Sequence, residues 1–172
     1  MTKQTVVITG VAGIAAWLLV FGLGIMVASQ PYRDQLAKSF DWGALLKALV
    51  TFTPTNVALL SVLAGLLGGC SSLLLYRDYT APPAGSPQAE KPSVDEERLA
   101  FLTENPVNSA LRGFAIYLTF LAGTVLGANQ PFSQTTQDQY CRMAGAVAIL
   151  AFAVGYDPTF FRQFISMLPK KK

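Results

Sequence analysis

The sequence predicts an all-α polytopic membrane protein, in which four transmembrane helices form two parallel-repeat helical hairpins and are accompanied by interfacial amphipathic helices. Three observations lead to this class. The 172 residues are 52% hydrophobic and only 13% charged, whereas soluble domains are usually about one quarter charged. The apolar residues gather in long blocks, and a hydrocarbon core about 30 Å thick takes about 20 helical residues to cross. A short motif also occurs twice, one hundred residues apart.

The first two apolar blocks, residues 6–29 and 56–76, contain no charged residue. Each is long enough to be a transmembrane helix. A cleaved signal peptide is the alternative for the first block, because Lys3 precedes it and residues 27–29 (VAS) resemble a cleavage site. The apolar stretch is longer than the roughly 7–15 residues usual in a signal peptide, so we expect a retained span.

The third and fourth blocks, residues 109–128 and 140–156, each contain one basic residue near an end. Arg112 and Arg142 are long enough to reach the headgroups while their aliphatic parts stay in lipid. We therefore expect both blocks to cross the membrane, and the fourth is the shortest of the four.

The motif Gln-Pro-aromatic follows both the first and the third block, at residues 30–32 and 130–132. An offset of one hundred residues also aligns Gly13 with Gly113 and Trp17 with Tyr117. An offset of eighty residues aligns Ala64 with Ala144, Gly65 with Gly145 and Tyr76 with Tyr156. The alternative explanation is that this motif is a common way to leave a membrane, because proline stops the helix and the ring anchors at the headgroups.

These alignments predict two copies of one hairpin, residues 1–76 and 105–172, within a single membrane domain that covers residues 1–172. An even number of crossings separates the copies, so both have the same orientation. A pseudo-twofold axis should then run along the membrane normal, as in transporters with parallel repeats.

Basic residues predict the orientation in the membrane. Nine of them belong to the N-terminus, the central segment and the C-terminus, whereas four belong to the two connections on the opposite side. The positive-inside rule places the more basic side in the cytoplasm. We expect both termini there, in a bacterial inner (plasma) membrane or a photosynthetic membrane.

Between the first two blocks, residues 35–55 carry apolar positions at roughly helical spacing. We expect a helix that lies on the outer membrane surface. The alternative is a re-entrant pore helix, because non-helical backbone is tolerated at membrane depth only where it lines a cavity or is covered by protein. Segment 40–55 would then form the outer mouth of a pore, lined by the hydroxyl groups of Thr51, Thr53 and Thr55.

The segment 77–104 is expected to be a cytoplasmic linker. Its first part is rich in proline, glycine and alanine, which is typical of flexible linkers. A capping-box pattern at residues 93–96 (SVDE) then predicts a short helix over residues 94–102. Asn105 and Pro106 supply a cap and a first-turn proline for the helix of the third block.

After the fourth block, residues 158–168 predict an amphipathic helix on the membrane surface, with docking of a partner as the alternative. Basic residues follow it, and each contributes about 1 kcal/mol of attraction to an anionic membrane. The residues assigned to this surface are Phe160, Phe161, Phe164, Ile165, Leu168, Lys170, Lys171 and Lys172.

Two pairs of glycines stand four residues apart within the predicted spans: Gly65 with Gly69, and Gly123 with Gly127. Such pairs lie on one face of a helix and let two helix backbones approach closely in lipid. We therefore assign them to helix packing or to contacts between subunits. Their spacing leaves open which of the two each pair serves.

The chain contains no histidine and only two cysteines, Cys70 and Cys141. Their separation fits no zinc, haem or redox motif. The sequence offers no set of acid, base and nucleophile, no phosphate-binding loop, and no basic surface suited to nucleic acid. We expect neither an enzyme nor a bound metal or cofactor.

Two functional hypotheses remain for such a chain in the lipid bilayer. The first is a structural, assembly or accessory subunit of a homo-oligomer or of a larger membrane protein complex. The alternative is an oligomeric passive channel for ions or small solutes. The middle of each predicted span contains no Asp, Glu or Lys. This favours the subunit hypothesis, since ion-coupled transporters usually carry such groups on their path.

Overall fold

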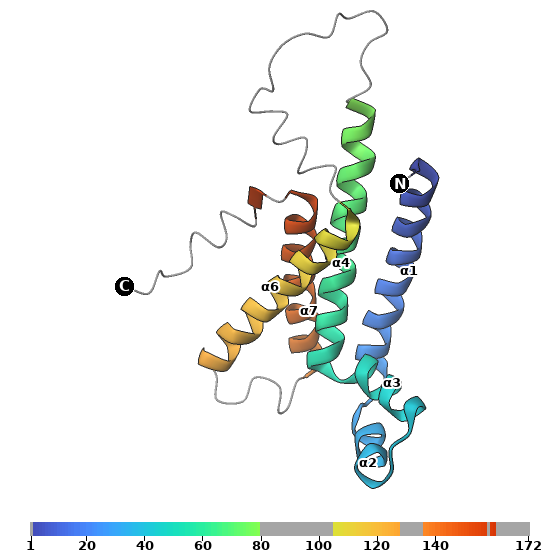
Figure 1. Cartoon of the computed structure of the whole chain (residues 1–172). Coiled ribbons are helices and arrows are strands. Elements are labelled where there is room, and N and C mark those ends of the chain that lie inside the picture. The colour runs from blue at the N-terminus through green and yellow to red at the C-terminus, as the bar shows by residue number, and fades with distance from the viewer. Residues whose placement is uncertain (1, 80–104, 128–135, 158, 161–172) are drawn as a thin grey trace, which may run out of the picture.

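The computed structural model describes residues 2–79, 105–127, 136–157 and 159–160 (Figure 1). Over these residues the chain is all-helical, as the sequence predicts, with six helices and no strand. The helices are α1 (Lys3–Met26), α2 (Gln30–Lys38), α3 (Trp42–Thr51), α4 (Thr53–Tyr79), α6 (Pro106–Gly127) and α7 (Gln137–Tyr156).

Two of these helices are long and apolar enough to cross a membrane. They are α1, over Lys3–Met26, and α4, over Thr53–Leu75. Helix α1 contains residues 6–26 of the first block without charge, and α4 contains the whole of the second block, residues 56–76. The third and fourth blocks overlap α6 and α7, which are 22 and 20 residues long.

Helix α4 is the centre of the arrangement (Figure 1). It packs along α7, along α6 and along α1, and α6 runs obliquely across it. In the most apolar 18-residue stretch of α4, 50% of the residues are buried inside the protein. In the corresponding stretch of α1 only 11% are buried. Helix α1 therefore lies at the edge of the bundle and contacts α7 only slightly.

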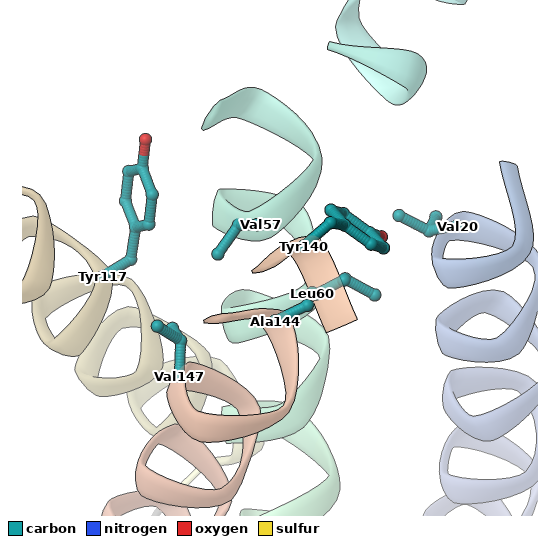
Figure 2. Close-up of a cluster of buried hydrophobic side chains, with 7 residues drawn as sticks. All are labelled: Val20, Val57, Leu60, Tyr117, Tyr140, Ala144 and Val147. Atoms are coloured by element: carbon teal, nitrogen blue, oxygen red, sulfur yellow. The ribbon is translucent and has the colours of Figure 1, made fainter. Parts of the chain in front are cut away.

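The main apolar core lies between the four long helices, and Figure 2 shows it. Leu60 of α4 and Val147 of α7 are almost completely buried at its centre. Tyr140 reaches from α7 toward Val20 on α1 (Figure 2). The seven buried residues of this core are Val20, Val57, Leu60, Tyr117, Tyr140, Ala144 and Val147.

Polar residues begin three of the long helices. Thr2 precedes α1, and its hydroxyl accepts from the Thr5 amide. The Asn105 side chain accepts from the Val107 amide at the start of α6. Thr136 and Gln139 form a reciprocal capping box at the start of α7. These bonds satisfy amide groups that have no partner inside the helix.

Residues 35–55 form parts of three helices rather than one continuous surface helix. Helix α2 ends at Lys38, and Ser39 is extended. Asp41 then starts α3, because its carboxylate accepts from the amides of Gly43 and Ala44 at 3.0 and 3.3 Å. Pro31, predicted to stop the first helix, lies in the first turn of α2, where proline is well tolerated.

Two predicted helices fall outside the described residues wholly or in large part. These are the helix predicted over residues 94–102 and the helix predicted over residues 158–168, of which only residues 159 and 160 are described. Thr159 and Phe160 are helical, and Phe160 is exposed.

Candidate functional site

Helix backbones approach each other closely at Gly65 in the middle of α4. A Cβ atom placed on Gly65 would lie 3.0 Å from Gly113 Cα on α6, and one placed on Gly113 would lie 3.1 Å from Gly65 Cα. A Cβ on Gly155 of α7 would lie 3.0 Å from Gly65 Cα. Backbone therefore meets backbone on two sides of α4, a contact that requires glycine.

The next turn of α4 continues this contact. A Cβ on Gly68 would lie 2.7 Å from the Tyr156 amide nitrogen, and one on Gly69 would lie 2.6 Å from Ser109 Cβ. Both distances are too short for real atoms, so α6 and α7 would have to move. Gly65 and Gly69 thus lie in contacts within the chain, and Gly68 joins them.

The second predicted glycine pair is placed differently. Gly123 is exposed, and a Cβ there would meet no atom within 4 Å. Gly127 is the last residue of α6. Leu118 and Ala122 on the same half of α6 are exposed as well. This half of α6 presents small and apolar residues outward.

A buried polar cluster, which we call the Asn56–Tyr140 node, joins four helices where α1 ends and α7 begins. The Asn56 side chain is fully buried. Its Nδ2 donates to the carbonyl oxygens of Val20 on α1 and Val50 on α3, at 2.8 and 2.5 Å. Its Oδ1 accepts from the Tyr140 hydroxyl of α7 at 2.7 Å. Each polar atom of the Asn56 side chain is therefore satisfied, as burial requires.

Aromatic contacts and one glycine complete the node. The Tyr140 hydroxyl lies 3.3 Å from the Phe21 carbonyl oxygen, and the two rings are 5.6 Å apart. Trp17 stacks on Phe21 with 5.1 Å between ring centroids. A Cβ on Gly24 would lie 2.7 Å from Tyr140 Cζ, so glycine is required for α1 to approach this ring.

The node was not among the sequence-predicted site residues. Asn56 stands at the start of an apolar block, and a polar side chain that enters a membrane segment usually finds a partner there. That signal identifies Asn56 alone. Its partner Tyr140 is 84 positions further along the chain, and no local pattern connects the two.

The three threonines assigned to a pore mouth lie at the junction of α3 and α4. The Thr51 side chain is buried, and its hydroxyl donates to the Lys47 carbonyl oxygen at 2.8 Å. The Thr55 hydroxyl donates to the carbonyl oxygens of Leu49 and Phe52. Thr53 is the first residue of α4. The bonds of Thr51 and Thr55 satisfy carbonyl groups in and after the last turns of α3.

Helix α3 has one buried face and one exposed apolar face. Ala44, Ala48 and Thr51 point into the protein. The exposed face, which we call the α3 aromatic face, consists of Phe40, Trp42, Leu46 and Leu49, which are 40–70% exposed. The rings of Phe40 and Trp42 meet edge to face at 5.0 Å.

The residues around α3 also hold two cations over aromatic rings. Arg33 lies 4.7 Å from the Phe52 ring centroid, and Lys47 lies 5.6 Å from that of Tyr32. Such contacts keep a charge near an apolar surface at low cost. They fit a segment at the boundary between lipid and water.

The described residues show where the remaining candidates lie. Cys70 is buried and Cys141 is half-buried, and both are free thiols. Within the described ranges, no group of three or more His, Cys, Asp and Glu side chains is placed to hold a metal ion. Of the docking residues predicted after the fourth block, only Phe160 lies in the described part.

Comparison of the chain with protein-family models, with curated proteins and with solved structures finds no significant match.

Proposed function

We propose that α1, α4, α6 and α7 all cross the membrane, as two hairpin copies with both termini in the cytoplasm. The outward apolar side chains of α6 and α7 support this for these two helices. Leu111 and Leu118 on α6 are 64% and 48% exposed, and Ile149 on α7 is 71% exposed. Lipid around these helices would remove that surface from water, at about 25 cal/mol per Å².

On this arrangement the chain acts as a non-enzymatic structural, assembly or accessory subunit of a homo-oligomer or a larger membrane complex. The observation that carries the proposal is the contrast between the two glycine pairs. Gly65 and Gly69 are enclosed by α6 and α7, whereas Gly123 faces outward with open space around it. A glycine surface that none of the described helices of its own chain covers suits a second helix from outside.

The channel alternative has less support from the same region. The Thr51 side chain is buried, and the hydroxyls of Thr51 and Thr55 are directed at backbone carbonyl oxygens rather than at an open mouth. We therefore keep the channel as the second hypothesis. Valine at Thr51, Thr53 and Thr55 tests it, since an ion flux that does not change excludes this mouth.

The test of the subunit proposal is mass analysis of protein extracted gently from its own membrane. We expect a defined homo-oligomer or a stoichiometric foreign chain. Gly123→Leu should lower the association constant at least about tenfold, which corresponds to about 1.4 kcal/mol. The matched control is Gly22→Leu on α1, because a Cβ placed on Gly22 would also meet no atom within 4 Å.

A monomer without any partner in the native extract would contradict the proposal. Equal dissociation by Gly123→Leu and Gly22→Leu would contradict the assigned surface, because a general loss of stability would then explain both.

A further inference from the structure

Helices α2 and α3 form a small lobe, residues 30–52, at the end of the bundle where α1 ends (Figure 1). Three residues of this α2–α3 lobe, Arg33, Lys38 and Lys47, are exposed cations. In the part of the chain that the structure describes, none of the three forms an ion pair. The lobe therefore has positive charge that no carboxylate opposes at short range.

The two acids of the lobe are held by other groups. Asp34 accepts from a glutamine side chain one turn before it, at 2.8 Å. Asp41 accepts from the amides that begin α3. Lys38 lies in the last turn of α2, where the carbonyl groups of the helix end attract a cation. Arg33 and Lys47 are thus the two cations of the lobe that neither a carboxylate nor a helix end holds.

Aromatic rings fix the positions of Arg33 and Lys47. The Arg33 guanidinium lies 4.7 Å from the centroid of the Phe52 ring, and Lys47 Nζ lies 5.6 Å from that of Tyr32. Because Tyr32 and Arg33 are neighbours, both cations lie along the contact between α2 and α3. A ring attracts a cation through its face but supplies no oxygen to accept the N–H groups, so both cations keep donors for an anion.

The α3 aromatic face sets the height of these cations relative to a membrane. Trp42, Leu46 and Leu49 lie on one side of α3 and are exposed. An α-helix turns about 100° per residue, so Lys47 lies about 140° around α3 from Trp42. When the indole ring of Trp42 lies at the boundary between lipid and water, Lys47 therefore points to the polar side, at the level of the lipid phosphates.

We propose that the α2–α3 lobe binds the phosphate groups of anionic phospholipids through Arg33 and Lys47, while the α3 aromatic face lies at the membrane boundary beside them. A phosphate suits both cations, because a guanidinium offers paired N–H donors and an ammonium a compact charge. The proposal rests on the four-span arrangement of the proposed function, which puts the lobe at one membrane surface. It adds the class of lipid that this surface prefers.

The selectivity of the lipids around Trp42 tests this binding. A Trp17→Phe variant, whose single tryptophan is Trp42, is reconstituted in vesicles that contain equal parts of phosphatidylcholine and phosphatidylglycerol. One of the two lipids is brominated near the headgroup, and the ratio of the two quenching strengths gives the preference for phosphatidylglycerol beside Trp42. We expect at least about a fivefold preference, which corresponds to the roughly 1 kcal/mol that one basic residue contributes at an anionic surface.

Two double variants with the same loss of charge separate this site from the net charge of the protein. Arg33→Gln with Lys47→Gln should abolish the preference, while quenching by brominated phosphatidylcholine shows that α3 is still at the membrane. Lys38→Gln with Arg142→Gln should keep the preference, since Arg142 is at the same end of the bundle but pairs with Asp138 at 3.0 Å. Arg33→Lys with Lys47→Arg should keep it as well, because both charges remain.

Equal quenching by the two brominated lipids would overturn the proposal and leave the four-span arrangement intact. A preference that survives the loss of Arg33 and Lys47, or that the Lys38 and Arg142 variant also loses, would overturn it too, because these two cations would then not be its cause. Quenching by neither lipid would overturn it together with the membrane position of α3. All of these results are independent of the association measured with Gly123→Leu.

Discussion

The hydroxyl of Tyr140 on α7 donates to the side-chain oxygen of Asn56 on α4 at 2.7 Å, and the amide of that asparagine holds α1 and α3. One buried side chain therefore connects four helices. In an apolar environment such bonds have no water to replace them, so the partners that remain after a substitution stay unsatisfied.

Substitution of Asn56 should destabilise the protein more than loss of the Tyr140 hydroxyl. Asn56→Ala removes the bonds that this side chain makes to two carbonyl groups and to one hydroxyl, and we expect a loss of about 1–3 kcal/mol in the free energy of unfolding. Tyr140→Phe keeps the ring and removes one bond, for which about 0.6 kcal/mol is the usual value inside a membrane. Unfolding in mixed micelles measures both.

The double variant gives the control for that prediction. If Asn56 and Tyr140 interact directly, the loss in the double variant should be smaller than the sum of the two single losses. Strict additivity would contradict the node as a coupled unit.

A single methyl group at Gly65 should separate the helices. In Gly65→Ala the new Cβ meets the backbone of Gly113 and Gly155, which cannot rotate away, and overpacking of this kind usually costs about 1–3 kcal/mol. Gly22→Ala is the matched variant, because the space there is open and alanine favours a helix. Thermal unfolding in detergent should show a lower midpoint for Gly65→Ala alone, and equal midpoints would contradict the backbone contact.

The sequence predicts the long helices well because each depends on local composition. Residues 6–29 and 56–76 lie almost entirely inside α1 and α4, and Asn105-Pro106 starts α6 as its cap pattern indicates. The break between α2 and α3 also had a local signal. Asp41 precedes Trp-Gly-Ala, and an aspartate before a helical run is a common cap.

The contacts between helices were not predictable from one sequence. Spacing identifies Gly65 and Gly69 as small residues on one face, but it does not say that the partners are Gly113 and Gly155. The node depends on Tyr140 and Asn56, which only the packing of α7 on α4 brings together. Such long-range choices follow from how all helices fit at once, rather than from any local pattern.

The α3 aromatic face should insert into the headgroup region of the bilayer. Trp42 is 70% exposed, and an indole ring prefers the boundary between lipid and water. In a Trp17→Phe background Trp42 is the single tryptophan, since the chain has two. Its fluorescence should be quenched by lipids brominated near the headgroup more than by aqueous iodide. Stronger quenching by iodide would contradict membrane contact.

The most direct test of the four-span arrangement, on which both proposals depend, is the sidedness of single cysteines in sealed vesicles. In a Cys70→Ala, Cys141→Ser background, we would place one cysteine at Gln4, Ser39, Asn108 or Gln137, all of which are exposed. A membrane-impermeant maleimide should label Gln4→Cys and Asn108→Cys only from the cytoplasmic face, and Ser39→Cys and Gln137→Cys only from the opposite face. The four-span arrangement would be contradicted if Gln4→Cys and Ser39→Cys were labelled from the same face. It would also be contradicted if Asn108→Cys and Gln137→Cys were labelled from the same face.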